Sequence, residues 1–145
     1  MKNSNKKGFT LVELVVVIAI IGVLAAILVP SMMGYVKKSR LKTANGNAKT
    51  AYNAIAEYVA DLETEGNLAS VDDDDAASIA EAELASNGNG AGKVATDVSK
   101  VAADTTGTAV WYAQWKKTAG DEIVGQYPEA PSKVGDTLTG GNLFA

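Results

Sequence analysis

The stretch GFTLVELVVVIAIIGVLAAILV, residues 8–29, decides how this chain is organised. Its last sixteen residues, Leu14 to Val29, carry no polar side chain. At a rise of about 1.5 Å per residue, a helix over residues 9–29 is roughly 32 Å long, which matches the hydrocarbon core of a bilayer. The sequence therefore predicts a membrane-spanning helix in this region.

One carboxylate, Glu13, stands near the start of the apolar stretch, and basic residues (Lys2, Lys6 and Lys7) precede it. An ionisable side chain inside a membrane is costly unless it is paired, and such residues are usually functional. We therefore expect Glu13 to need a partner that neutralises it.

The basic leader, the hexapeptide GFTLVE (residues 8–13) and the apolar run together resemble the class III signal sequence of type IV pilins and pseudopilins. The resemblance covers residues 6–62. It implies that a prepilin peptidase cuts after Gly8 and that the new N-terminal residue, Phe9, is N-methylated. It also implies that Glu13 pairs with Phe9 of a neighbouring subunit and so sets the register of a filament.

Three other readings compete for this segment. A conventional secretory signal peptide has a basic start and an apolar core, but Glu13 interrupts the approach to the core and no Ala-x-Ala site follows Val29. An ordinary single-span anchor gives no reason for Glu13 or for the pair Gly8-Phe9. A buried core helix is disfavoured because sixteen unbroken apolar residues exceed what a domain of this size would cover.

Charge alone does not decide the topology. The apolar span has three leader lysines on one side and four basic residues on the other, namely Lys37, Lys38, Arg40 and Lys42. The positive-inside rule therefore gives nearly a tie. The family resemblance implies that the precursor spans the plasma membrane once, with its leader in the cytoplasm and the remainder outside.

Past the apolar span, apolar residues recur every three or four positions, which predicts one stripe on a helix face. These are Leu41, Ala44, Ala48, Ala51, Ile55, Val59 and Leu62. We expect one helix whose first half is apolar all round and whose second half is amphipathic. Pro30 predicts a kink or local break, whereas the stripe continues in phase through Asn45-Gly46-Asn47. In some assembled pilins the helix loses hydrogen bonds between positions that match Gly22 and Pro30.

The remaining sequence predicts a small head. Gly66-Asn67 ends the long helix, and a second helix follows from Asp72–Asp75 to Asn87-Gly88. A glycine-rich loop over residues 87–92 precedes expected strands at 94–98, 108–117 and 122–127, with a turn at 118–121 and a possible terminal strand at 138–144. An antiparallel sheet packed on the stripe buries both apolar faces.

We therefore predict an α+β fold with the ladle-like form of pilins. The expected organisation is a leader at 1–8, a transmembrane and assembly helix at 9–30, its amphipathic half at 31–62 and a globular head at 63–145.

Composition limits the function. The chain has 145 residues and a net charge of −4; loss of the three leader lysines leaves 10 basic and 17 acidic residues, or −7. Such an acidic head argues against nucleic acid as the primary partner. Histidine and cysteine are absent, so the usual general bases, thiol nucleophiles and disulfides are missing. We expect no enzyme activity, cofactor or metal, and the lack of a C-terminal disulfide fits the clostridial and other Gram-positive branch of the family.

Three further candidate sites compete with structural explanations. Consecutive aspartates at 72–75 lack the spacing of a calcium loop and fit a solvated helix start. The glycines at 88, 90 and 92 lack the first glycine and the preceding strand of a phosphate loop. Trp111, Tyr112 and Trp115 fit either core packing, which is favoured, or a carbohydrate-binding patch.

The most consistent hypothesis is a type IV pilin that polymerises with itself into an extracellular filament for adhesion, motility or aggregation. Its implied partners are a prepilin peptidase, the pilus assembly platform in the membrane and the membrane itself. The alternatives are a pseudopilin of a type II secretion system and a membrane-anchored adhesin that never polymerises.

Overall fold

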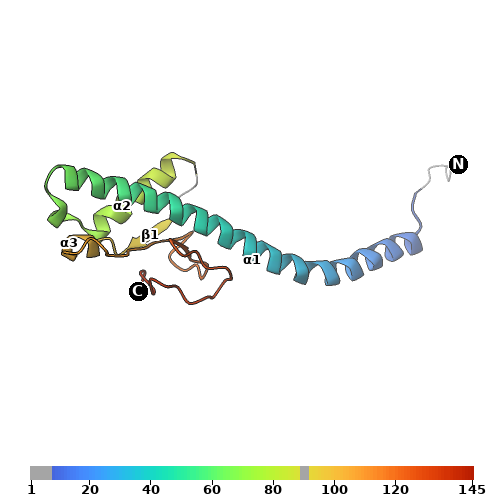
Figure 1. The fold of residues 1–145 in the computed structure, drawn as a ribbon. Coiled ribbons are helices and arrows are strands. Elements are labelled where there is room, and N and C mark those ends of the chain that lie inside the picture. The colour runs from blue at the N-terminus through green and yellow to red at the C-terminus, as the bar shows by residue number, and fades with distance from the viewer. Residues whose placement is uncertain (1–7, 89–91) are drawn as a thin grey trace. The chain divides into compact units, whose positions relative to one another are not determined.

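The computed structural model of the chain describes residues 8–88 and 92–145. Most of the expected leader and residues 89–91 of the glycine-rich loop lie outside this part. The structure divides after Val36 into two compact units. In chain order the elements are α1 (Leu11–Thr64), η1 (Leu68–Ser70), α2 (Asp73–Ser86), β1 (Lys93–Thr96), α3 (Lys100–Ala103), β2 (Ala113–Lys116) and β3 (Gly125–Tyr127), as Figure 1 shows. The α+β class predicted from the sequence is confirmed.

Helix α1 is a single helix of 54 residues that contains Pro30 in its interior. The local break expected at Pro30 is therefore absent from this structure. In its second half the predicted stripe is confirmed, because the buried apolar residues recur every three or four positions. They are Leu41, Ala44, Ala48, Ala51 and Ile55, with Val59 and Leu62 partly buried against the same core.

The weak helical stretch at Asn45 has a structural explanation. The Asn45 side chain donates from Nδ2 to the Pro131 carbonyl at 3.0 Å and accepts the Gln126 amide on Oδ1 at 3.1 Å. Beside it, β3 approaches α1 so closely that a Cβ on Gly125 would lie 2.1 Å from the Ala44 carbonyl carbon. Asn45 thus has a low helix propensity, but its side chain joins α1 to the head.

The predicted end of α1 and the predicted start of α2 are both confirmed. Gly66, with φ +78°, follows α1, and the Asn67 amide donates to the Leu62 carbonyl at 2.8 Å, as in a Schellman motif. Asp72 caps α2, since its Oδ1 accepts the amides of Asp74 and Asp75 at 2.9 and 3.1 Å.

The sheet is antiparallel, with strand order β1-β2-β3. Each strand is shorter than the sequence predicts. The expected strand over 108–117 begins only at Ala113, because residues 104–109 fold around the Asp104 carboxylate. That carboxylate accepts hydrogen bonds from Thr106 and from the Ala109 amide, which lies 2.6 Å from Oδ2. Neither α3 nor η1 was predicted.

The predicted terminal strand at 138–144 is wrong, since this segment forms turns. It is held instead by two glutamines of the sheet, Gln114 and Gln126, which are fully buried. Gln114 donates to the Gly141 carbonyl at 2.6 Å and accepts the Leu143 amide at 3.2 Å, while Gln126 accepts the Gly140 amide at 3.2 Å. The hydrogen bonds of the segment thus go to side chains rather than to a strand edge.

Candidate processing and assembly site

The candidate site begins where irregular backbone meets the first turn of α1. Gly8, Phe9 and Thr10 precede the helix and are exposed. The Thr10 hydroxyl accepts the Glu13 amide at 3.2 Å, and its carbonyl accepts the Leu14 amide at 3.1 Å. Thr10 is therefore the N-cap of α1, in a Thr-x-x-Glu spacing typical of a capping box.

This cap places the start of the helix at Leu11, two residues later than the start at Phe9 that the sequence predicts. A helix starting at Phe9 would place Phe9 and Glu13 four residues apart on one face, where they could neutralise each other. Because α1 begins at Leu11, Phe9 lies outside the helix and the pair lacks that geometry. The sequence signal for this start is the spacing of Thr10 and Glu13, which is typical of a capping box.

Glu13 lies in the first turn of α1 and is exposed. A carboxylate at this position interacts favourably with the positive end of the helix dipole. Within residues 8–88 and 92–145, no lysine or arginine forms an ion pair with it. The cap bond of this turn is made by the Glu13 backbone amide and not by its carboxylate, for which the described residues provide no cation.

The apolar half of α1 is covered by nothing in the described structure. Its side chains from Leu14 to Val29 are roughly half exposed or more, for example 64% for Ile18 and 65% for Ile27. By length and composition this helix can cross a membrane. A contiguous apolar surface of this extent needs lipid or other protein to cover it.

Gly22 and Pro30 lie inside this apolar half. A Cβ built on Gly22 would meet no atom within 4 Å, so packing within the chain does not require glycine there. Gly22 therefore lowers the helix propensity of α1 without allowing any closer packing within the chain.

The weaker candidate sites resolve into structural roles. Asp72–Asp75 form the cap and first turn of α2, and the described residues hold no cluster suited to a metal ion. The glycine-rich candidate lies partly outside the described residues. Trp111, Tyr112 and Trp115 are each less than 10% exposed, so they pack in the head and do not form a surface patch. Trp111 stacks on Tyr52 of α1 with ring centroids 3.9 Å apart.

Comparison with known proteins shows that the region containing this site is similar to the corresponding region of pilins. Residues 3–29 match the family described as the prokaryotic N-terminal methylation motif. The fimbrial protein EcpC of Eikenella corrodens is 46% identical over 61 residues, covering 42% of this chain and 40% of the relative. The type IV major pilin protein PilA of Myxococcus xanthus is 36% identical over 67 residues, covering 46% and 30%. The type IV major pilin protein PilE1 of Neisseria gonorrhoeae is 41% identical over 56 residues, covering 39% and 34%.

The chain thus spans 40% or less of the length of these relatives. No solved structure matches it. The matched region contains GFTLVE and the apolar half of α1, whereas much of the head lies beyond the aligned residues. The N-terminal region of this chain is therefore similar to that of type IV pilins, and it matches their N-terminal methylation motif.

Proposed function

We propose that the chain is the structural subunit of a type IV pilus, made as a membrane-held precursor and polymerised into an extracellular filament. One observation carries this proposal: the motif GFTLVE opens an apolar helix that nothing in the described chain covers, and the same helix continues into a folded head. Such a helix suits both lipid before assembly and neighbouring copies afterwards. Adhesion, surface motility and aggregation are the roles such a filament would serve.

Processing would take place at the junction of Gly8 and Phe9. A prepilin peptidase cuts after Gly8, and Phe9 becomes an N-methylated terminus that keeps its positive charge. The exposed, non-helical backbone of residues 8–10 supports this step, because a protease needs an accessible peptide bond.

The proposed partners follow from the same sequence. They are other copies of this chain, the prepilin peptidase, the assembly platform and, before assembly, the plasma membrane with the leader on its cytoplasmic side. The role is structural rather than catalytic, in line with relatives named as pilins and fimbrial proteins.

Mass spectrometry of sheared extracellular material tests the processing step. We expect a chain that begins with N-methylated Phe9, and we expect Gly8→Trp to leave the precursor uncut, because a bulky side chain prevents the close backbone approach that glycine permits. Ser4→Ala in the leader is the matched control and should be processed normally. An intact leader on extracellular wild-type protein would contradict the proposal.

Electron microscopy of the same cells tests assembly. Filaments should be present in the wild type, absent after deletion of the gene and restored by complementation. A processed chain that stays in the membrane without filaments would favour a pseudopilin. An uncut chain without filaments would favour a membrane-anchored adhesin.

A further inference from the structure

One face of α1 in the head has no partner within the described chain. The buried stripe, represented by Ile55, faces the core. At 3.6 residues per turn, Glu57 lies about 160° around the helix from Ile55 and therefore points away from the core. Glu57 and Asp61 are both exposed on this outer side.

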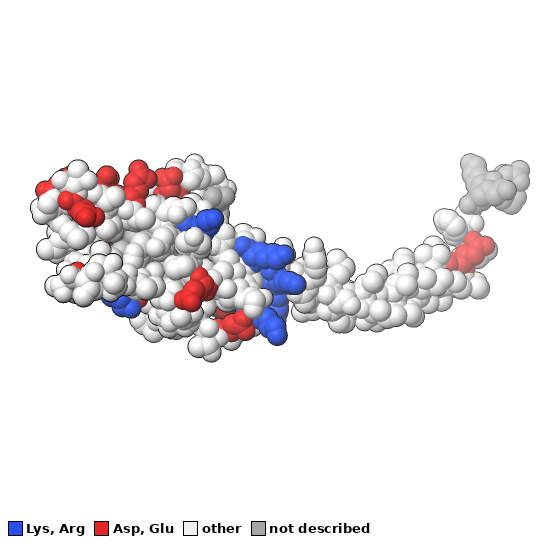
Figure 2. All heavy atoms as spheres, in the orientation of Figure 1, with Lys and Arg blue, Asp and Glu red and all other residues white. Residues whose placement is uncertain are grey.

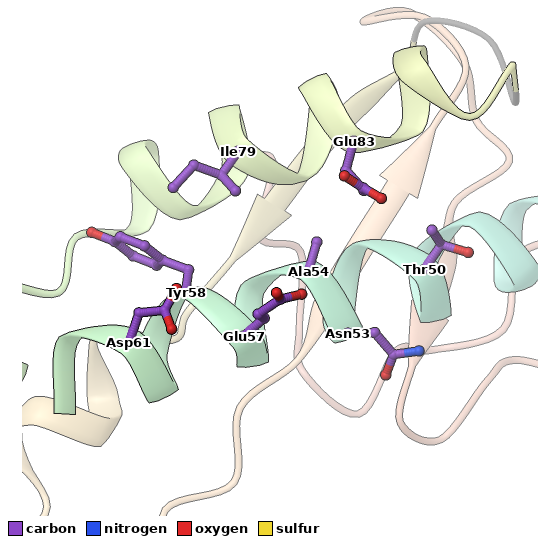
Figure 3. Close-up of a pocket in the computed structure, with 8 residues that line it drawn as sticks. All are labelled: Thr50, Asn53, Ala54, Glu57, Tyr58, Asp61, Ile79 and Glu83. Carbon is purple, nitrogen blue, oxygen red and sulfur yellow. The ribbon is translucent and has the colours of Figure 1, made fainter. Parts of the chain in front are cut away.

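This face forms one wall of a groove between α1 and α2, which Figure 3 shows. Its volume is about 420 Å³, and eight residues line it: Thr50, Asn53, Ala54, Glu57, Tyr58 and Asp61 from α1, and Ile79 and Glu83 from α2. We call it the acidic groove, because three of its side chains are carboxylates. Only Glu83 among them accepts a side-chain hydrogen bond in the described structure, from Asn87 at 3.1 Å.

No cation of the described residues neutralises the acidic groove. The ion pairs found among the described residues join Arg40 to Asp121, at 2.7 Å, and Lys100 to Asp97, and all four residues lie outside the groove. Neither of these two ion pairs involves a carboxylate of the groove.

A complementary surface lies earlier on the same helix. Lys37, Lys38, Arg40 and Lys42 form a basic collar, visible as the blue band in Figure 2. At about 100° per residue the three lysines of the collar span about 140° around α1, whereas Arg40 already pairs with Asp121. The lysines of the collar are exposed.

We propose that the acidic groove of one subunit receives the basic collar of another copy in the filament. The inference rests on the proposed polymerisation. A filament that buries the apolar halves of α1 among copies also brings together the turns that follow them. The outer face of α1 then meets other subunits, and Glu57 and Asp61 need cations there because a buried unpaired charge is strongly unfavourable.

Helix geometry fixes the stagger that this contact requires. Within one chain, Lys38 lies 19 residues before Glu57 and Lys42 lies 19 residues before Asp61, so each pair is about 28 Å apart along α1. The two surfaces therefore cannot meet within one chain. They meet between two parallel copies displaced along the filament axis by about 28 Å, because this one displacement brings Lys38 to Glu57 and Lys42 to Asp61.

Charge reversal tests the contact. Glu57→Lys with Asp61→Lys, and separately Lys38→Glu with Lys42→Glu, should each lower the yield of sheared filaments at least about tenfold, while the combined fourfold variant recovers most of the yield. Glu63→Lys lies on α1 outside the groove and is the matched control, with normal yield expected. Cleavage of each precursor shows that the variant is made and inserted.

Cross-linking gives an independent readout, because the natural chain has no cysteine. In filaments that carry both Lys42→Cys and Glu57→Cys, a bismaleimide with a reach of about 10 Å should produce dimers and higher oligomers. The chain with either cysteine alone should give none. Positions 42 and 57 of one subunit are 15 residues apart, or about 22 Å along α1, which exceeds the reach of the reagent and excludes a link within one subunit.

The outcomes separate this inference from the proposed function. Normal filaments from both reversed variants, or no recovery in the combined variant despite normal cleavage, would overturn the contact while leaving polymerisation intact. So would cross-linking that does not require both cysteines. An absence of filaments in the wild type would instead overturn the proposed function.

Discussion

Single oxygen-bearing side chains fix where the elements of this chain begin and end. Thr10 caps α1, Asp72 caps α2, and Asp104 organises the loop that delays the start of β2. In each case a side-chain oxygen accepts backbone N–H groups that lack a partner in regular structure. Short-range signals of this kind are readable from sequence: the aspartates at 72–75 predicted the start of α2, although the cap by Asp72 itself was not predicted.

Asp104 should make the head sensitive to acid. The hydrogen bonds from the Thr106 hydroxyl, the Thr106 amide and the Ala109 amide lower the pKa of Asp104 from its usual value of 3.8 to about 2. A depressed carboxyl pKa stabilises the fold above the unfolded pKa, so this contribution is lost as the pH falls from about 4 to about 2.

We therefore expect Asp104→Asn to flatten the decline of the melting temperature over that interval, as measured by circular dichroism of detergent-solubilised protein. Glu65→Gln, at an exposed position, serves as the control and should keep the wild-type slope. Equal slopes for Asp104→Asn and the wild type would rule out this role.

The elements differ in how far the sequence predicts them. Helices α1 and α2 were predicted with nearly correct ends, because periodicity and caps are local. The strands were predicted too long and the terminal strand was wrong, because those residues depend on partners distant in sequence. Nothing near residues 138–144 indicates that Gln114 and Gln126, which lie 14 to 29 positions earlier in the sequence, will hold them.

The two glutamines should be required to hold the C-terminal segment. Gln114→Leu leaves the Leu143 amide and the Gly141 carbonyl without their partner, at a cost of about 1–3 kcal/mol for each group that stays buried. We expect a lower urea midpoint and faster proteolysis after residue 138. Thr137→Val, at an exposed position beside the segment, should leave both unchanged. A Gln114→Leu protein as resistant as the wild type would show that packing alone holds the segment.

Helix α1 should change its conformation between precursor and filament. In the single chain it is continuous from Leu11 to Thr64, although Gly22 and Pro30 are both poor helix formers. We predict an extended stretch between these two residues in the filament, where packed neighbours can satisfy the released backbone groups that lipid cannot. A cryo-electron microscopy map with unbroken helical hydrogen bonds from Gly22 through Pro30 would refute this, and Gly22→Ala should shift the filament toward a continuous helix.

The molecule as a whole combines an apolar helix with a head whose charge is segregated. The sequence was sufficient to identify Gly8, Phe9 and Glu13 as candidate site residues, because their pattern is contiguous. It was not sufficient to identify the acidic groove, because α2 reaches α1 only through the fold. The groove and collar would set one contact between copies, and Glu13 would set another.

The contact at Glu13 leads to the last prediction. In an apolar phase a lone carboxylate must be protonated or meet a cation, and cleavage after Gly8 creates a cation at the amine of Phe9. Since Phe9 lies outside α1, this amine is free to meet Glu13 of a neighbouring subunit. A slip by one helical turn would leave both charges buried and unpaired, at a cost of roughly 3–5 kcal/mol. Removal of the leader would thus permit assembly, because it creates the positive charge that pairs with Glu13 and removes the three leader lysines.

We predict that Glu13→Ala is still cleaved and inserted into the membrane but fails to form normal filaments. Glu13→Gln, which keeps the size and the polar atoms but loses the charge, should fail in the same way, and this separates the charge from the capping spacing with Thr10. Thr10→Ala is the matched control for the cap: it removes the hydroxyl that accepts the Glu13 amide and leaves the carboxylate in place, so filaments should still form. Filament number and length, counted by electron microscopy, provide the measurement. Wild-type filaments from Glu13→Gln cells would mean that packing of the apolar helices sets the register without the charge.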